Sequence, residues 1–403
     1  MRPNRRDIAA GLLAAFLAAR VSAQTPDTTT RTSLIEQAQA DKAAVLQPYT
    51  PGAAEKYVNY AEDYLKGGNL HWHPFFDNAY AGGGFTLGGG YLQHFGAAST
   101  LDLRGSITFQ GYKRVEAEVI APGAFFGRRV SASLLGGWRE ATKVGFYGLG
   151  MSTTEADRAN YGFKQPYGAA SIAIFPFHRW LVLRGGFEAS QWQQTPGAGE
   201  APSVEDVYTP ATLTGLGAKP VYFHSQATVG FDSRPSPGYA RRGGYYAVTV
   251  HDFTDPDAVY GFQMVDYEAI QHVPLLREAW VLSFRGLVET TSLKNDQQIP
   301  FFMLPALGGG SDLRAFSSWR FRDRNSLLLQ AEWRIMVNRF LDTAVFGDFG
   351  KVTASRSDLN LHGLKTDGGF GFRFHGPLAT PLRLDFAQGA EGFSIVFGAS
   401  AVF

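Results

Sequence analysis

The feature that most constrains the fold of this chain is an alternation of apolar and polar residues that begins near Asn78 and continues to residue 403. Successive side chains of a β-strand point to opposite faces, so a period of two indicates strands with one apolar and one polar face. In one such strand the apolar series is Leu327, Leu329, Trp333, Ile335 and Val337, and the polar series is Gln330, Glu332 and Arg334. About 16 segments of this kind follow one another, at roughly 20 residues for each strand and its connection, which predicts an all-β chain.

The charges on the polar faces decide between two architectures. A soluble β-sandwich would bury the apolar faces and expose the charged ones. A membrane-spanning barrel places the apolar faces against lipid and lines a water-filled interior with the polar ones. Aromatic residues end many of the apolar faces, as in the girdles at the two membrane interfaces. These residues are Trp138, Tyr147, Trp180, Trp192, Tyr245, Trp280 and Trp333. We therefore predict an antiparallel, membrane-spanning β-barrel of about 16 strands over residues 78–403.

Composition supports strands and gives no sign of nucleic-acid binding. The 403 residues include 47 Gly, 32 Phe and 17 Tyr but no Cys, and the net charge is +1. So small a net charge provides no argument for nucleic acid or for an acidic partner. After the first 25 residues no apolar run reaches the ~18 residues that a membrane helix needs. We predict no nucleic-acid partner and a chain that crosses the membrane with strands.

The first 77 residues predict two segments ahead of the barrel. Three arginines within the first six residues precede an apolar stretch, and Val21, Ser22 and Ala23 resemble a cleavage site. Residues 1–23 therefore have the pattern of a secretory signal peptide, with a buried N-terminal helix as the alternative. Residues 24–77 predict a periplasmic segment with two short helices, over 33–46 and 53–65. This segment either caps the barrel or forms a loosely ordered tail.

A glycine-rich, charged loop after residue 308 supplies the strongest candidate site. Its centre consists of Leu313, Arg314, Ala315 and Phe316. Glu332 and Asp348 follow on the next two strands, both on the polar face by alternation. Arginine keeps its charge, and its planar fork pairs with a carboxylate through two hydrogen bonds. One interpretation is that Arg314 docks the loop inside the barrel on these carboxylates and so controls access to the lumen. The alternative is an exposed Arg314 beside ordinary lumen carboxylates.

Other candidate sites are weaker. His71 and His73 share one face of an extended segment, but the sequence offers no third metal ligand beside them. Four loop aspartates lack the ligand spacing of an EF-hand, namely Asp206, Asp232, Asp255 and Asp257. No G-x-S-x-G elbow is present. We predict no metal, no cofactor and no catalytic residue. Glycines at 82–84 and 88–90 fall in the first predicted strand, and they either make it easy to open or allow close packing of a plug.

The final strand has the form of an insertion signal. Phe393, Ile395, Phe397 and Phe403 share one face by alternation. A last strand that ends in an aromatic residue resembles the C-terminal recognition signal of bacterial outer-membrane proteins. We predict that these four residues direct insertion by the barrel-assembly machinery and then contact outer-membrane lipid.

Four passages together resemble the barrel domain of the BamA/TamA superfamily, also called the bacterial surface antigen family. They are Phe-Tyr-Gly-Leu-Gly at 146–150, the hairpin that begins Asp-Ser-Arg-Pro at 232–235, the loop centre at 313–316, and Phe-Gly-Asp-Phe-Gly at 346–350. The loop falls between the eleventh and twelfth predicted strands, and Asp348 lies on the thirteenth, as in the family. Ala315 stands where the family usually has glycine, which permits positive φ at little cost. Residues 24–77 are too few for a POTRA domain and a linker, so the resemblance is to a form that lacks POTRA domains.

This resemblance implies an integral outer-membrane protein of a Gram-negative cell, and it favours the docked Arg314 over the exposed one. The implied function is to assist the insertion or export of protein or lipid, together with a periplasmic or outer-membrane partner protein, and not to act as an enzyme. The charged polar faces favour an alternative, a pore for the passive passage of small solutes.

Overall fold

The computed structural model describes residues 56, 71–96, 98–125, 129–176, 180–276, 278–398 and 400–403. Apart from Lys56, the predicted signal peptide and the two predicted N-terminal helices lie outside these residues. The chain divides into two compact units after Lys66, and all of the described residues except Lys56 belong to the second unit, Gly67–Phe403. In the part of the chain that is described, no helix is long and apolar enough to cross a membrane.

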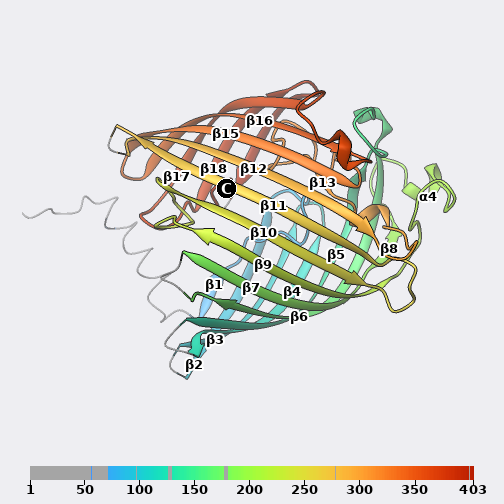
Figure 1. Cartoon of the computed structure of the whole chain (residues 1–403), viewed down its shortest axis with the longest axis horizontal. Coiled ribbons are helices and arrows are strands. Elements are labelled where there is room, and N and C mark those ends of the chain that lie inside the picture. The colour runs from blue at the N-terminus through green and yellow to red at the C-terminus, as the bar shows by residue number, and fades with distance from the viewer. Residues whose placement is uncertain are drawn as a thin grey trace, which may run out of the picture. The chain divides into compact units, whose positions relative to one another are not determined.

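The second unit is an antiparallel sheet of 17 strands that curls into a barrel, with a separate two-stranded hairpin (Figure 1). The first eight strands are β1 (Trp72–Pro74), β2 (Thr86–Phe95), β3 (Ser99–Thr108), β4 (Lys113–Phe125), β5 (Val130–Phe146), β6 (Ala159–Ile174), β7 (Leu181–Gln191) and β8 (Gln193–Pro196). The other sheet strands are β9 (Val221–Asp232), β10 (Gly243–Thr254), β11 (Phe262–Leu275), β12 (Trp280–Leu293), β15 (Asn325–Asn338), β16 (Leu341–Thr353), β17 (Lys365–Phe374), β18 (Leu382–Gly389) and β19 (Gly392–Gly398). The hairpin pairs β13 (Ala306–Leu307) with β14 (Phe321–Arg322). The short helices are η1 (Glu155–Asp157), α4 (Val204–Val207), η2 (Phe301–Met303) and η3 (Arg356–Asp358).

The predicted antiparallel barrel is confirmed, although two of its predicted strands were wrong. Strands β7 and β8 lie end to end beside β6, so the 17 strands fill 16 positions. The sequence predicts two separate strands here, beginning near residues 128 and 142, but these residues form the single strand β5. A register shift between Ala141 and Val144 interrupts its alternation and imitates a turn in the sequence. The sequence also predicts a first strand from about residue 79. That strand begins at Thr86, and β1 fills the position before it.

The two faces of the sheet differ as the alternation predicts. Large apolar side chains are exposed on the outer face, among them Val115, Val229, Tyr267, Phe284, Val345 and Phe370. Inward side chains form ion pairs across neighbouring strands. Arg104 Nε donates to Glu116 Oε2 at 2.9 Å, and Arg285 Nε donates to Glu268 Oε1 at 2.8 Å. An apolar exterior around a polar interior is the arrangement of a membrane barrel.

Only part of the predicted aromatic girdle lies on the outer face. Three members are exposed there, Trp180, Trp280 and Trp333. For three others the prediction was wrong, because they are buried, namely Tyr147, Trp192 and Tyr245. The Arg320 guanidinium lies 4.8 Å from the centre of the Tyr147 ring, and the Trp192 ring stacks on Phe302 at 5.8 Å. Both partners belong to a long connection, and alternation near the end of a strand does not reveal such an inward contact.

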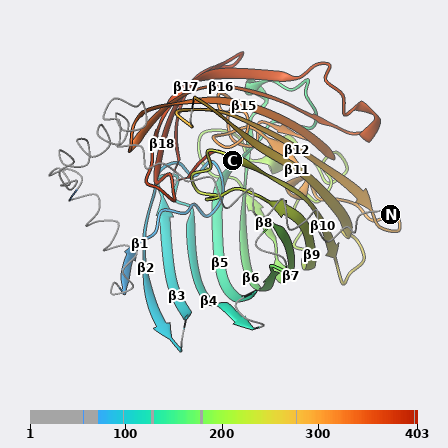
Figure 2. The same cartoon turned by 60° about the vertical axis from the view of Figure 1, so that its left-hand side comes forward.

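Two long connections, 197–220 and 294–324, lie at one end of the barrel, which we call the loop end (right of Figure 1, beside the label α4). Figure 2 shows β2 to β6 side by side in the wall of the barrel. The sequence predicts long loops over 193–220 and 294–322, and the first of these also contains the short strand β8. The apolar residues of the two connections join inward residues of the strands in one buried aromatic cluster, which includes Phe146, Tyr161, Phe163, Trp192, Leu213, Tyr222, Ile299, Phe301 and Phe302. The Phe146 and Phe301 rings, for example, meet edge to face at 5.0 Å. Packed side chains therefore occupy the interior at the loop end.

At the opposite end, which we call the turn end, the connection 233–242 between β9 and β10 crosses the interior. The Tyr239 hydroxyl donates to Asp342 Oδ2 at 2.9 Å, and the Tyr239 ring stacks on His375 at 3.9 Å. Asp342 belongs to β16, and His375 follows β17. The connection thus reaches from one wall of the barrel to another.

The last strand ends before the predicted signal does. Three of the predicted signal residues are exposed on the outer face of β19, namely Phe393, Ile395 and Phe397. Pairing with β18 ends at Gly398, opposite Arg383. Beyond this point the chain turns inward, and Phe403 packs on Tyr245, Ala247 and Ile270. The prediction that Phe403 shares the outer face was therefore wrong. The part of these residues in membrane insertion stays a prediction.

Candidate functional site

The candidate site is built on a loop between β13 and β14, residues 308–320, which we call the docking loop. Gly308 and Gly309 begin it with φ of 119° and 107°, a backbone conformation that favours glycine. A Cβ added at Gly308 would lie 2.4 Å from Ser317 O, so the loop closes tightly on itself here. Its buried apolar residues pack on the hairpin and on β15 and β16 in a cluster of Leu307, Leu313, Phe316, Phe321, Leu328 and Val352.

Arg314 lies inside the barrel and is fully buried. Its Nε donates to Asp348 Oδ2 at 2.7 Å and its Nη2 donates to Asp348 Oδ1 at 2.8 Å, which is the two-bond geometry of an arginine on a carboxylate. Its Nη1 lies 3.3 Å from both Glu332 Oε2 and Asp385 Oδ2. The guanidinium carbon stands 3.4 Å from the centre of the Phe346 ring. The structure thus brings Arg314 together with both carboxylates that the sequence analysis named.

Two further arginines complete the charge balance of the site. Arg373 Nη2 donates to Glu332 Oε2 at 2.6 Å, and its Nη1 donates to Asp385 Oδ1 at 2.5 Å. Arg383 Nη1 lies 3.4 Å from Asp385 Oδ2. With Arg314 and Asp348, these groups make three guanidinium groups and three carboxylates, all buried. A buried charge is tolerated only when it is paired and hydrogen-bonded in this way.

The backbone of the docking loop is also held. Ala315 N donates to Asp367 Oδ2 at 3.1 Å, and Ser394 Oγ donates to Ala315 O at 3.3 Å. Ala315 does not adopt a positive φ, so glycine is not required at this position of the chain. A Cβ added at Gly389 of β18 would lie 2.9 Å from Ala315 Cβ. Because Gly389 has no side chain, the methyl group of Ala315 fits against β18 at this position.

Two ionisable side chains of the docking loop, Arg314 and Asp312, have shifted pKa values. Burial alone would lower the pKa of Arg314, but its hydrogen bonds to Asp348 and the charge of that carboxylate raise it above the usual value. Arg314 therefore stays charged at every relevant pH. Burial raises the pKa of Asp312 to about 6, against the opposing effect of the Arg285 charge. Asp312 is thus the titrating group of the loop closest to neutral pH.

The end of the docking loop contacts two distant parts of the chain. Arg320 Nη2 donates to Glu391 Oε1 at 2.8 Å, between β18 and β19. Trp319 Nε1 donates to Ala81 O at 2.9 Å, and the Trp319 ring stacks on Tyr80 at 4.5 Å, just before β2. One loop therefore touches the residues that flank both the second and the last strand of the sheet.

Sequence reasoning missed several members of this site. Arg373, Asp385 and Asp367 face inward by the same alternation that identified Glu332 and Asp348. That alternation was the available signal, but it gives the face of a residue and not its partner. The pair of Arg320 with Glu391 links two connections, to which strand periodicity does not apply.

The weaker candidates have structural partners. His73 Nε2 lies 2.8 Å from Asp102 Oδ1. Asp232 accepts from Arg234 Nη2 at 3.0 Å, and Asp255 Oδ2 accepts from Tyr260 N at 2.8 Å. Within the described ranges, no group of three His, Asp or Glu side chains is arranged to hold a metal ion.

The glycines of the predicted first strand allow close packing. A Cβ added at Gly88 would lie 2.5 Å from Phe75 O, and one added at Gly90 would lie 2.4 Å from the His73 ring. Both lie in β2, against β1 and the residue that follows it. The sequence left two interpretations open, an easily opened strand and close packing, and the contacts support close packing.

Residues 93–398 of this sequence match the Omp85 superfamily domain. BamA from Haemophilus ducreyi lacking POTRA domains 1-3 is a similar solved structure, with a TM-score of 0.58 and 15% identity over 84% of this chain and 76% of that chain. CdiB from Escherichia coli is another, with a TM-score of 0.53 and 11% identity over 81% of this chain and 61% of that chain. Among curated proteins none matches. At these identities the solved structures establish the fold, and the predicted resemblance to the BamA/TamA barrel is confirmed.

Proposed function

Since this chain belongs to the Omp85 superfamily and is an outer-membrane barrel of the insertion and secretion class, we propose that it helps to insert or export protein or lipid across the outer membrane. Passage would use the lumen or the seam at which the last strand, β19, meets the start of the sheet. A periplasmic or outer-membrane partner protein would deliver the client. We infer no enzymatic activity, because the sequence has no G-x-S-x-G elbow.

The observation that supports this proposal is the buried network around Arg314. Replacing such a network by packed apolar residues is often neutral or stabilising, so stability alone does not explain it. The best-attested use of a buried ion pair is to specify one arrangement among several. Here the arrangement specified is the docked position of a loop inside the lumen. We infer that the network holds the lumen closed and that a client is moved when the loop shifts.

The alternative, a pore for passive passage of small solutes, requires a continuous polar path through the barrel. The aromatic cluster at the loop end and the docking loop both stand in that path. This arrangement favours a barrel that is closed at rest over an open pore.

Purified protein in phosphatidylcholine vesicles tests the proposal. Two clients are offered separately, a urea-unfolded eight-stranded barrel protein and a phospholipid with a fluorescent head group. We expect the wild-type protein to accelerate the folding of the first or the transbilayer movement of the second, and we expect Arg314→Ala to change that rate several-fold.

The matched control is Arg242→Ala, because Arg242 is an exposed arginine that pairs with Glu278 at 3.5 Å outside the network. This variant should behave as wild type does. If neither client responds to the wild-type protein, and the same protein gives steady openings in planar bilayers, the solute pore replaces our proposal.

A further inference from the structure

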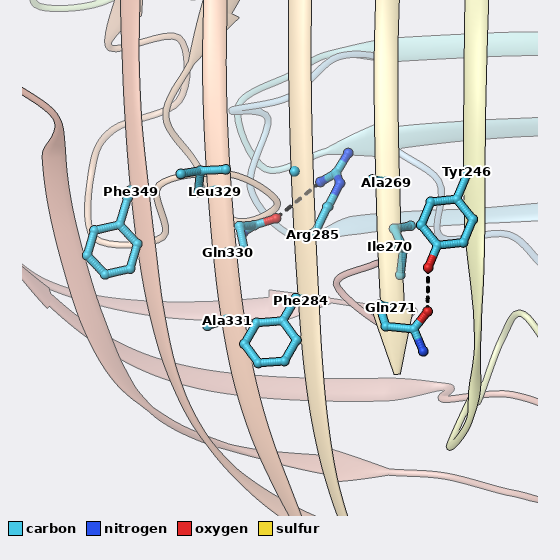
Figure 3. Close-up of a pocket in the computed structure, with 11 residues that line it drawn as sticks. Tyr246, Ala269, Ile270, Gln271, Phe284, Arg285, Leu329, Gln330, Ala331 and Phe349 are labelled. Carbon is cyan, nitrogen blue, oxygen red and sulfur yellow. Dashed lines mark hydrogen bonds between the residues drawn. The ribbon is translucent and has the colours of Figure 1, made fainter. Parts of the chain in front are cut away.

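The outer face of the barrel carries a groove across β10, β11, β12, β15 and β16 (Figure 3). Its volume is about 450 Å³, which is within the range of small-molecule sites. The docking loop lies on the other side of the same strands, so the groove is separate from the site described above.

Small residues form the floor of this groove. Ala269 of β11 stands opposite Gly286 of β12, and Ala331 of β15 stands opposite Phe284 of β12. A Cβ added at Gly286 would have a single neighbour within 4 Å among the described residues, a Leu329 methyl group at 3.6 Å. The space above Gly286 is therefore open.

Large apolar side chains form the walls. Tyr246, Phe284 and Phe349 point outward and are exposed by 45%, 47% and 39%. Tyr246 and Leu329 stand in one cross-strand row with Ala269 and Gly286, one at each end of the two small residues. Large residues beside small ones thus turn a flat strand surface into a concave one.

The groove presents no charge and few polar atoms to an occupant. Its one outward polar pair satisfies itself, because the Tyr246 hydroxyl donates to Gln271 Oε1. The charged neighbour Arg285 points to the interior, where it donates to Glu268 Oε1 at 2.8 Å and to Gln330 Oε1 at 3.2 Å. An occupant of this groove must therefore be a hydrocarbon.

We propose that this groove binds one acyl chain of a membrane phospholipid, held between Tyr246, Phe284, Leu329 and Phe349 over the floor of Ala269 and Gly286. The outer face of a membrane barrel is bathed in such chains. Within a bilayer the hydrophobic effect does not separate protein from lipid, so affinity depends on van der Waals contact. A concave surface touches a chain on several sides, whereas a flat surface touches it on one. A protein partner would need an interface of roughly 1,000 Å² or more, which a groove of this size does not supply.

Photo-crosslinking tests the proposal. The full chain is reconstituted into phosphatidylcholine vesicles that contain a small fraction of phosphatidylcholine with a diazirine midway along one acyl chain. After illumination, mass spectrometry locates the adducts. We expect the adducts to concentrate on peptides of β11 and β12, and we expect Gly286→Leu, which fills the floor, to reduce the yield there at least fivefold.

The control is Gly136→Leu, because Gly136 is an exposed strand glycine on β5, away from the groove, and an added Cβ there would have no atom of the described residues within 4 Å. It should leave the yield on β11 and β12 unchanged. Migration of the folded barrel on a gel before heating shows that both variants have folded. Uniform adducts around the wild-type barrel, or an equal loss in both variants, would overturn the proposal.

Discussion

At the scale of single residues, the two hydrogen bonds from Arg314 to Asp348 are the feature on which the docked loop depends most. Asp348→Asn keeps the shape of the side chain but leaves a buried guanidinium without its main counter-charge. Breaking a buried pair from one side costs about 3–5 kcal/mol. We expect the free energy of unfolding, measured by urea titration in lipid vesicles, to fall by that amount.

The matched control for this substitution is Asp358→Asn in the exposed helix η3, which should change the same free energy by no more than about 0.5 kcal/mol. If Asp348→Asn and Asp358→Asn lower the free energy of unfolding by the same amount, the pair of Arg314 and Asp348 does not hold the loop.

A second prediction at this scale concerns pH and Asp312. The pKa of Asp312 is raised to about 6 in the docked loop, against about 3.9 for an exposed aspartate. Because the pKa of Asp312 is higher in the docked loop, its protonated form stabilises docking. This contribution is complete below a pH of about 3.9 and is lost as the pH rises through about 6. We therefore expect protease cleavage within 308–320 to increase by a factor of roughly 10 to 100 between pH 4 and pH 7.

Asp312→Asn should remove most of this increase, because an amide does not titrate in that range. A cleavage rate of the wild-type loop that falls with rising pH over the same interval would contradict the assignment.

At the scale of elements, the docking loop and β18 are fitted to each other at one pair of residues. Gly389→Ala would place a Cβ 2.9 Å from Ala315 Cβ and 3.3 Å from Asp367 Cβ. Overpacking of this kind costs about 1–3 kcal/mol. We expect the unfolding free energy to fall by that amount and to recover in the double variant Ala315→Gly with Gly389→Ala.

This double-mutant cycle isolates the contact, because each single change acts on one partner. If Ala315→Gly does not rescue Gly389→Ala, the loss comes from Asp367 or from the strand itself. Gly136→Ala provides the baseline for adding a methyl group to a strand glycine, because no atom in the described part of the chain lies within 4 Å of the added Cβ.

The same pair of elements shows how far sequence reasoning reaches. Alternation placed Glu332 and Asp348 on the inner face, and the resemblance of the loop motif to the BamA/TamA superfamily favoured Arg314 as their partner, so the centre of the site could be predicted. Alternation does not say which inward residues of distant strands meet, so Asp385 and Arg373 were missed. It also fails where a bulge interrupts a strand, as in β5, and where a chain leaves its strand, as before Phe403.

At the scale of the whole molecule, the barrel is obstructed at both ends by its own connections. The aromatic cluster and the docking loop occupy the loop end. At the turn end, the connection 233–242 reaches across to β16 and to the residues that follow β17. Two obstructions in series mean that the release of one alone leaves the path narrow.

The last prediction rests on this series arrangement. Arg314→Ala releases the docking loop, and Tyr239→Ala removes the ring that stacks on His375 and the hydroxyl that bonds Asp342. In planar bilayers we expect rare, brief openings from each single variant and steady, larger openings from the double variant. Tyr267→Ala, a change on the exposed outer face, should conduct as the wild-type protein does. If Arg314→Ala alone conducts as much as the double variant, the connection 233–242 does not restrict the lumen, and the docking loop alone closes the barrel.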